Sequence, residues 1–249
     1  MMNEVIETMM QHRSIRNYKD TIITDEQLYT IIEAGQMAST SSNLQAYSII
    51  NIVDRRLRHE LAELAGPQWH VDTAPVFLVW CADLRRVAVA TETTIDKHIE
   101  NLELTENFLV ATVDTALAAQ NSALAAESMG LGILFVGGIR NQIEQVSQLL
   151  KLPQHVVPLF GMCIGYPDEQ PFIRPRFSLE AVLHQNSYNE EKIEATIAEY
   201  DERVVDYVME RSNGADSFSW SESMRRRLSQ ARQRTTQQAF FQSKGLMKK

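Results

Sequence analysis

The sequence predicts an α+β fold in which a central antiparallel or mixed sheet is wrapped by helices. Short continuous apolar runs, such as residues 76–80, have the length expected of buried strands. Longer segments, such as residues 25–37, repeat apolar side chains at the spacing of an amphipathic helix. Strands and helices do not alternate regularly along the chain, which argues against a doubly wound α/β sheet.

The expected elements are distributed along the whole chain. Thr24 offers an N-cap to the helix at residues 25–37, and Gly66 and Pro67 end a helix at residues 55–64. Gly130 is expected to end a long helix that begins near His98. Helices are expected at residues 5–9, 25–37, 55–64, 98–129, 142–150 and 189–209 with an amphipathic tail helix after them, and strands at residues 47–53, 76–80, 133–136 and 157–164.

The long helix is expected to be the centre of the molecule. Its residues 110–126 include seven alanines and are apolar on more than one face. Such a helix is either buried all round or packed against a partner subunit. Because small side chains let helices approach closely, we expect it at the centre of both the subunit and an intertwined homodimer.

Composition excludes several classes of protein. The 249 residues are 44% hydrophobic, enough for a full core, and we expect a single domain. The net charge of −8 disfavours a nucleic-acid partner, and the basic run at residues 225–227 is expected to be a solvated helix face. Cys81 and Cys163 each lie in an apolar run, which indicates core packing and a reducing compartment. The sequence contains no Cys/His spacing of the kind that predicts a metal site. We see neither a signal peptide nor a membrane span, so the expected location is the cytoplasm.

Two polar segments in the first half of the chain suit ligand binding. Residues 12–16 combine an imidazole, a hydroxyl and two guanidiniums, a compact donor set for a phosphate monoester. A basic turn at a helix C-terminus would have the same composition. Residues 38–45 are rich in hydroxyl and amide side chains, which either bind the polar edge of a ligand or cap a turn.

Two further segments follow in the second half. Residues 130–140 contain four glycines around a strand, where a backbone without side chains can lie against a flat ring or a phosphate. The glycine spacing differs from the dinucleotide-binding fingerprint, and a helix precedes the strand, so a Rossmann domain is rejected. Arg174 and Arg176 flank Pro175, which holds two cations close together on a stiff loop.

In this order, the four segments resemble the nitroreductase superfamily, in particular its branch of oxygen-insensitive NADPH nitroreductases and NADPH–flavin oxidoreductases. The HRSIR sequence at residues 12–16 is the most specific part, and residues 141–165 and 184–188 are also similar. The resemblance covers nearly the whole chain. It implies an α+β homodimer with two FMN sites at the subunit interface, each built from both chains.

The resemblance also implies which residues bind FMN. Basic and hydroxyl side chains would contact its phosphate and ribityl end, polar loops would line the cofactor, and the glycine segment would lie against the isoalloxazine edge. The implied residues are His12, Arg13, Ser14, Arg16, Arg174 and Arg176 for the first group, Thr40, Ser41 and Gln68 for the second, and Val136, Gly137 and Gly138 for the third. Two positions depart from the branch: residues 37–40 lack its proline, and Arg174 replaces a lysine.

The implied activity is reduction of nitroaromatics, quinones or free flavins by NADPH in a ping-pong hydride transfer. Since the chemistry belongs to FMN, no side chain is expected to be catalytic and no metal is expected. Residues 189–249 are expected to form late helices and a C-terminal arm over the active site, with Arg211 and Arg234 contacting NADPH or the acceptor. Two alternatives remain: an NADPH-dependent FMN reductase as the main physiological role, and a non-catalytic flavin-binding protein.

Overall fold

The computed structural model describes residues 2–91, 96–230 and 234–249. The chain forms two compact units, of which the larger contains the residues before 172 together with 234–249, and the smaller contains residues 172–230. Across the described residues, no helix is long and apolar enough to cross a membrane.

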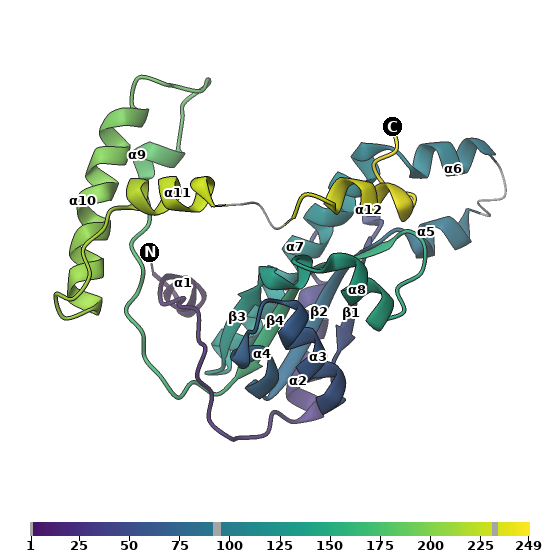
Figure 1. Cartoon of the computed structure of the whole chain (residues 1–249), viewed down its shortest axis with the longest axis horizontal. Coiled ribbons are helices and arrows are strands. Elements are labelled where there is room, and N and C mark those ends of the chain that lie inside the picture. Colours follow the sequence, from purple (N-terminus) through teal and green to yellow (C-terminus); the bar gives the residue numbers. More distant parts are fainter. Residues whose placement is uncertain (1, 92–95, 231–233) are drawn as a thin grey trace. The chain divides into compact units, whose positions relative to one another are not determined.

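The larger unit is built on a four-stranded antiparallel sheet, the only sheet among the described residues (Figure 1). Its order is β1-β2-β4-β3, and every neighbouring pair is antiparallel. The strands are β1 (Tyr47–Asn51), β2 (Val76–Asp83), β3 (Gly132–Val136) and β4 (Val156–Gly165). The predicted fold class is therefore confirmed, and the sheet is antiparallel rather than mixed.

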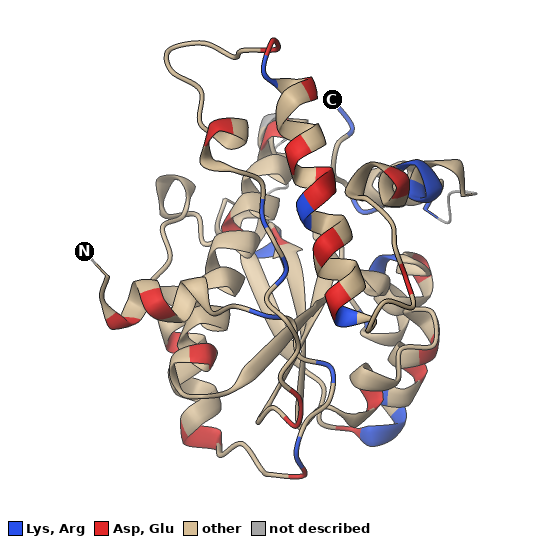
Figure 2. Cartoon of the chain, turned by 90° about the vertical axis from the view of Figure 1, so that its left-hand side faces the viewer, with Lys and Arg blue, Asp and Glu red and all other residues tan. Residues whose placement is uncertain are grey.

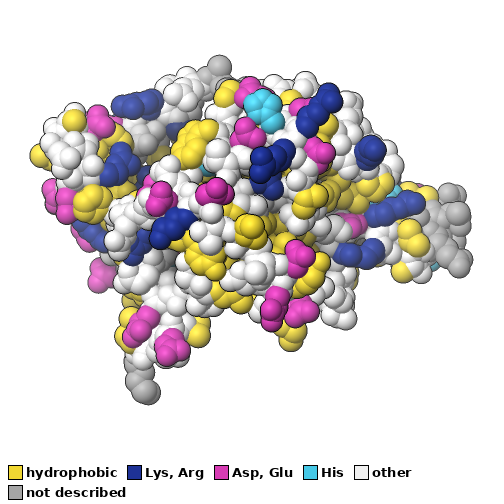
Figure 3. Space-filling model, turned by 90° about the horizontal axis from the view of Figure 1, so that it is seen from below, with side chains coloured by type: hydrophobic (Ala, Val, Ile, Leu, Met, Phe, Trp, Pro, Cys, Tyr) yellow, Lys and Arg dark blue, Asp and Glu magenta, His cyan; other side chains and the backbone are white. Residues whose placement is uncertain are grey.

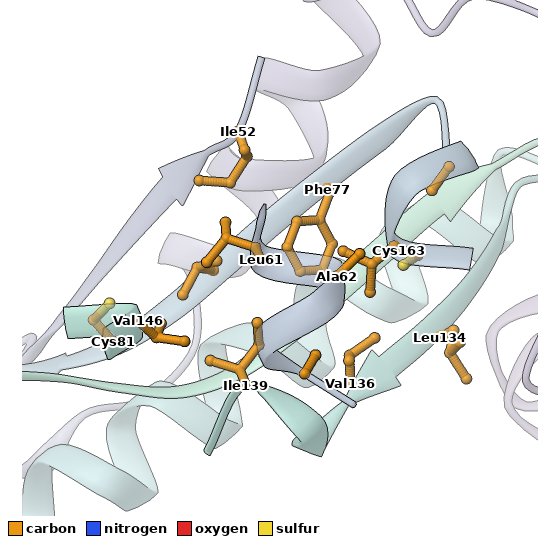
Figure 4. Close-up of a cluster of buried hydrophobic side chains, with 14 of the residues drawn as sticks. Ile52, Leu61, Ala62, Phe77, Cys81, Leu134, Val136, Ile139, Val146 and Cys163 are labelled. Carbon is orange, nitrogen blue, oxygen red and sulfur yellow. The ribbon is translucent and has the colours of Figure 1, made fainter. Parts of the chain in front are cut away.

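Strand β2 is buried along its whole length because helices cover both faces of the sheet. Phe77, Val79 and Cys81 point to one face, which is packed against α3 (Arg55–Leu64), α4 (Trp69–Thr73) and α8 (Ile143–Leu149) (Figure 4). Their neighbours Val76, Leu78 and Trp80 point to the other face, which is packed against α2 (Asp25–Gln36) and α7 (Thr105–Ser128). This two-sided burial explains why β2 appears in the sequence as a continuous apolar run.

Helices α2 and α7 approach each other closely. A Cβ atom added to Gly35 would lie 2.2 Å from Ser122 Oγ and 3.0 Å from the carbonyl oxygen of Ala118, so only glycine fits there. The Ser122 hydroxyl also donates to the carbonyl oxygen of Ile31 at 3.0 Å. The predicted N-cap of α2 is confirmed, because the Thr24 hydroxyl accepts from the Gln27 N–H in a capping box.

The prediction of a single long helix from residue 98 is wrong. It is two helices, α6 (Asp96–Leu102) and α7, interrupted at Glu103 and Leu104. The C-terminus of the chain occupies the backbone groups that a continuous helix would use: the Thr105 N–H donates to the Lys249 carbonyl oxygen at 2.9 Å, and the Lys248 N–H donates to the Glu103 carbonyl oxygen at 3.0 Å. The predicted end is confirmed, since Gly130 follows α7 with a φ of +76°.

The chain by itself does not bury α7 on all sides, so the other expected arrangement, packing against a partner subunit, stays a prediction. The alanines of α7 face the sheet and α2, and Ala118, Ala119 and Ala123 are fully buried. On the outer side, Leu109, Val113 and Leu117 are 55%, 46% and 45% exposed. Among the described residues, the helix therefore presents an apolar stripe that is about half exposed.

A third core cluster lies at the end of the sheet next to the C-terminus. Phe240 and Phe241 of α12 (Gln237–Ser243) pack with Leu84, Leu102 and Val157. Short helices that periodicity did not predict complete the larger unit: α4, α5 (Arg85–Ala90), and the 3₁₀ helices η1 (Ser41–Asn43) and η2 (Gly137–Arg140). The first helix, α1 (Glu4–Met10), has no buried residue.

The smaller unit consists of α9 (Leu179–Val182), α10 (Ile193–Arg211) and α11 (Trp220–Ser229). Three aromatic rings form its centre, with the Phe177 ring 4.0 Å from that of Tyr200 and 5.2 Å from that of Trp220. The remaining surface of α10 carries many carboxylates, visible as red bands in Figure 2. The expected arm is divided, since residues 234–249 belong to the larger unit, and its placement over the active site stays a prediction.

Charged side chains of both signs are interspersed on the face shown in Figure 3. The two cysteines are buried and unpaired, as predicted. Burial raises the pKa of both thiols, that of Cys81 to about 12, so both remain protonated and unreactive near neutral pH.

Candidate functional site

The turn between β3 and η2 places a bare stretch of backbone beside the loop that precedes α4. Val136 ends β3, and Gly137 and Gly138 open η2. A Cβ atom on Gly138 would lie 2.3 Å from the Ala65 carbonyl oxygen and 2.4 Å from Gln68 Nε2. Glycine is required at this position because the two segments touch there.

A chain of hydrogen bonds connects this turn with the C-terminal segment. The Ala65 carbonyl oxygen accepts from Gln68 Nε2 at 3.0 Å and from Asn141 Nδ2 at 2.8 Å. Asn141 Oδ1 in turn accepts from Arg234 Nε at 3.0 Å and Nη2 at 2.9 Å, and Arg234 Nη2 also donates to the Gly137 carbonyl oxygen at 2.9 Å. Four residues singled out from the sequence, Gln68, Gly137, Gly138 and Arg234, therefore lie together.

Arg16 lies beside the same group of residues. The N–H of Ile15 donates to the Ile133 carbonyl oxygen at 2.9 Å, which fixes the N-terminal segment alongside β3. Arg16 is exposed, and its guanidinium acts with burial to lower the pKa of His70.

Burial alone would raise the pKa of Glu169, but hydrogen bonds from Arg16 and Asn17 outweigh it and lower that pKa. The Glu169 carboxylate thus anchors the backbone and leaves the Arg16 side chain exposed.

His12 and Arg13 already have protein partners. His12 Nδ1 lies 2.6 Å from Glu127 Oε1, and Arg13 Nη2 donates to Gln11 Oε1 at 2.8 Å. Arg13 and Glu127 line a cavity of about 880 Å³ whose charged lining residues are five carboxylates (Glu4, Glu7, Glu127, Asp168 and Glu169) and two cations (Arg13 and Lys19). Ser14, between them and Ile15, is half-buried. A cavity of this charge repels a phosphate, so His12 and Arg13 would have to change partners to bind one.

The hydroxyl-rich loop is held by a buried carboxylate that the sequence analysis did not single out. Asp114 of α7 is only 1% exposed. Its Oδ1 accepts from the Ser41 N–H at 3.0 Å, and its Oδ2 accepts from the Ala46 N–H at 3.2 Å. Thr40 is half-buried and Ser41 is exposed, so the loop presents hydroxyls to its surroundings. The only signal in the sequence was a single acidic residue within the alanine-rich stretch 110–126.

The remaining predicted residues lie in the smaller unit, where two of them share one aromatic ring. The guanidinium carbons of Arg174 and Arg211 lie 6.0 Å and 5.6 Å from the centre of the Tyr207 ring. Arg176 Nη1 donates to the Arg174 carbonyl oxygen at 3.0 Å. The predicted phosphate cradle therefore draws residues from both units, and its assembly stays a prediction.

Comparison with known proteins finds similar families, sequences and structures. The Nitroreductase family model matches residues 9–166, and the model of the Nitroreductase family C-terminal domain matches residues 174–249. The FMN reductase (NADPH) of Bacillus subtilis is 44% identical, over 90% of each chain. The NADPH-flavin oxidoreductase of Vibrio harveyi is 42% identical over the whole of both chains. The solved structure of the NfrA1 nitroreductase from B. subtilis superposes with a TM-score of 0.94 at 42% identity, covering 98% of this chain and 100% of that one.

Replacing Asp114 by Asn should loosen the hydroxyl loop. An amide offers one acceptor oxygen where the carboxylate offers two, so the N–H of Ser41 or of Ala46 loses its partner. We expect the free energy of unfolding to fall by about 2 kcal/mol, the usual cost of one unsatisfied buried donor. Chemical denaturation measures it, with Glu106→Gln on the exposed first turn of α7 as the matched change. Equal stability of the Asp114→Asn variant and the wild type would show that the carboxylate does not hold the loop.

Proposed function

The chain belongs to the nitroreductase family, and on this basis we propose that it is an FMN-dependent oxidoreductase that uses NADPH to reduce nitroaromatics, quinones or free flavins. The observation that carries the proposal is the hydrogen-bonded group around the β3–η2 turn. Gln68, Gly137, Gly138 and Arg234 come from distant parts of the sequence and meet at one bare stretch of backbone. Related proteins are named for NADPH and for flavin.

The residues present fit the ring of FMN. Gly138 is packed against Ala65 and Gln68, whereas the half-buried Gly137 beside it leaves backbone without a side chain, against which a flat heteroaromatic ring can lie. Gln68 carries one amide hydrogen beyond the one given to Ala65, and it can donate to a ring acceptor. His70 Nδ1 is buried and has no hydrogen-bond partner among the described residues, which marks the same place as polar but incompletely satisfied.

The other end of FMN is a phosphate of about two negative charges, for which guanidiniums are the preferred partners. Arg16 is exposed in the larger unit, and Arg174 and Arg176 are exposed in the smaller unit. His12, Arg13 and Ser14 complete the proposed set. The acidity of the chain as a whole makes this concentration of arginines more telling, because most of its surface repels a phosphate.

When bound, FMN accepts a hydride from NADPH and passes the electrons to the acceptor. The chain's own residues bind and orient the cofactor, and no side chain is proposed as catalytic. The related proteins are named for different acceptors, nitro compounds or flavins, which is consistent with one open stacking place that tolerates several. The alternative physiological role, reduction of free flavin by NADPH, would use this same site. The proposed location is the cytoplasm, in keeping with two unpaired cysteines.

We also propose that the protein is a homodimer whose FMN sites each use both chains. The outer stripe of α7 (Leu109, Val113 and Leu117) is apolar and exposed, and so are Val5, Met9 and Met10 of α1. An exposed stripe of this kind is typical of an interface. Thr40 and Ser41 are tied to α7 by Asp114, so the helix that would form the interface also positions the hydroxyl loop. Through it, one subunit would line the cofactor of the other.

Removal of a phosphate-binding arginine should weaken FMN retention. We expect Arg16→Ala and Arg176→Ala each to lose about 1.5–3 kcal/mol of binding free energy, as for other charged hydrogen bonds. Fluorescence titration of flavin-free protein with FMN measures the loss. Arg56→Ala, a change of the same kind at a fully solvated position of α3, is the control. An unchanged affinity for FMN in both variants would show that these arginines are surface charges that do not bind the cofactor.

A charge in the α7 stripe should disrupt the dimer. The expected interface buries well over ~2,000 Å², as intertwined dimers do, and Val113 lies at the middle of the stripe. We expect Val113→Glu to be monomeric in sedimentation and to lose FMN, whereas Val53→Glu, which is 75% exposed outside the stripe, should remain a dimer. A wild-type monomer that retains FMN would contradict the shared site.

NADPH should be preferred to NADH, because a guanidinium can bind the 2′-phosphate of NADPH, and NADH lacks this phosphate. We expect Arg211→Ala to lower kcat/KM for NADPH about tenfold, equal to about 1.4 kcal/mol, and to leave NADH little changed. Arg234→Ala should lower kcat/KM for both nucleotides, because it also removes a support of the Gly137 turn. Arg203→Ala on α10 is the control. Equal use of both nucleotides by the wild type would refute the preference.

A further inference from the structure

Gln68 lies at the closest contact between the loop before α4 and the glycine turn. Its Nε2 is the atom that a Cβ on Gly138 would meet at 2.4 Å. The amide of Gln68 therefore lies against the Gly137–Gly138 turn, where the flavin ring is proposed to bind. Whether that amide presents its N–H or its carbonyl oxygen decides whether it attracts or repels the acceptor atoms of the ring.

Two neighbours fix the orientation of this amide. The Ala65 carbonyl oxygen lies 3.0 Å from Nε2 and can only accept, so the group facing it must be the NH₂ of Gln68. The other end, Oε1, lies 2.8 Å from His70 Nε2. Since a carbonyl oxygen cannot donate, the hydrogen of that bond belongs to His70. The bond to Ala65 alone would let the amide rotate about one contact, whereas two bonds fix its plane.

The state of the His70 ring agrees with this role. Burial, and then the nearby Arg16 guanidinium, lowers the pKa of His70, so the ring is neutral near neutral pH. A neutral ring with its proton on Nε2 has an unprotonated Nδ1. That atom is buried and has no partner among the residues the structure describes. The Trp69 ring packs edge-on against His70 at 5.7 Å and holds it in place.

We propose that His70 is a positioning residue that locks Gln68 with an amide N–H, rather than its carbonyl oxygen, turned toward the Gly137–Gly138 turn. The inference rests on the proposed function, because the N–H would serve a flavin ring there. One hydrogen of the Gln68 NH₂ is used by Ala65, and the second is available to the ring. A donor at that position favours the electron-rich state of the flavin and raises its midpoint potential.

The test is the two-electron midpoint potential of the FMN-loaded protein. His70→Phe keeps a ring against Trp69 but removes the donor, and we expect the ratio of affinities for reduced and oxidised flavin to fall about tenfold, which is about 30 mV. His70→Gln supplies a donor of similar reach and should restore the wild-type potential. Gln68→Ala should lower the potential as His70→Phe does. The double variant should match Gln68→Ala alone, because His70 acts through Gln68.

Additive shifts in the double variant, or a wild-type potential in His70→Phe when Gln68→Ala shifts it, would overturn the proposal. The tautomer is a second readout that needs no cofactor. In the full chain stripped of flavin, the ring ¹⁵N shifts of His70 should show a proton on Nε2, and a proton on Nδ1 would overturn the proposal. A wild-type protein that takes up no FMN would contradict the proposed function, while the tautomer would still decide the role of His70.

Discussion

The close packing of α7 against the sheet and against α2 supports most of the larger unit. Only small residues allow it: Gly35 on α2 meets Ser122 and Ala118 on α7 at distances that leave no room for another methyl group. The same approach brings Asp114, on α7, within reach of the backbone of residues 41 and 46. Because the inner side of the helix packs in the core, Leu109, Val113 and Leu117 face outward. Core, hydroxyl loop and proposed dimer interface thus depend on one helix.

Much of the fold could be predicted from local pattern. The Thr24 cap, the glycine that ends α7 and the two-sided burial of β2 are all local signals. The break between α6 and α7 could not be predicted, because its cause is distant in the sequence: the chain's last two residues take the backbone groups of Glu103 and Thr105. Helices as short as α4 and α5 leave too few residues for a period to be recognised.

Some residues of the site could be predicted from the sequence and others could not, and the reason for this difference is physical. Glycines and clustered arginines stand out in a sequence, because few structural tasks need them in those combinations. Asn141 and His70 do not stand out, since each is an ordinary polar residue until Arg234 or Gln68 is placed beside it. The partner of His12 was equally hidden, because Glu127 lies 115 residues away in the chain. The sequence does not reveal which distant residues pair, and residues whose role depends on such a pair are missed.

A glycine turn, an oriented amide and a set of guanidiniums make up the proposed site for a flavin and a reduced nicotinamide nucleotide. Its most direct test is anaerobic titration of the FMN-loaded protein with NADPH, followed in the visible absorption of the flavin. We expect rapid bleaching that is complete at about one NADPH per FMN, with the colour restored by a quinone or a nitroaromatic compound. A protein that binds FMN but leaves it oxidised in excess NADPH, as a non-catalytic flavin-binding protein would, contradicts the account.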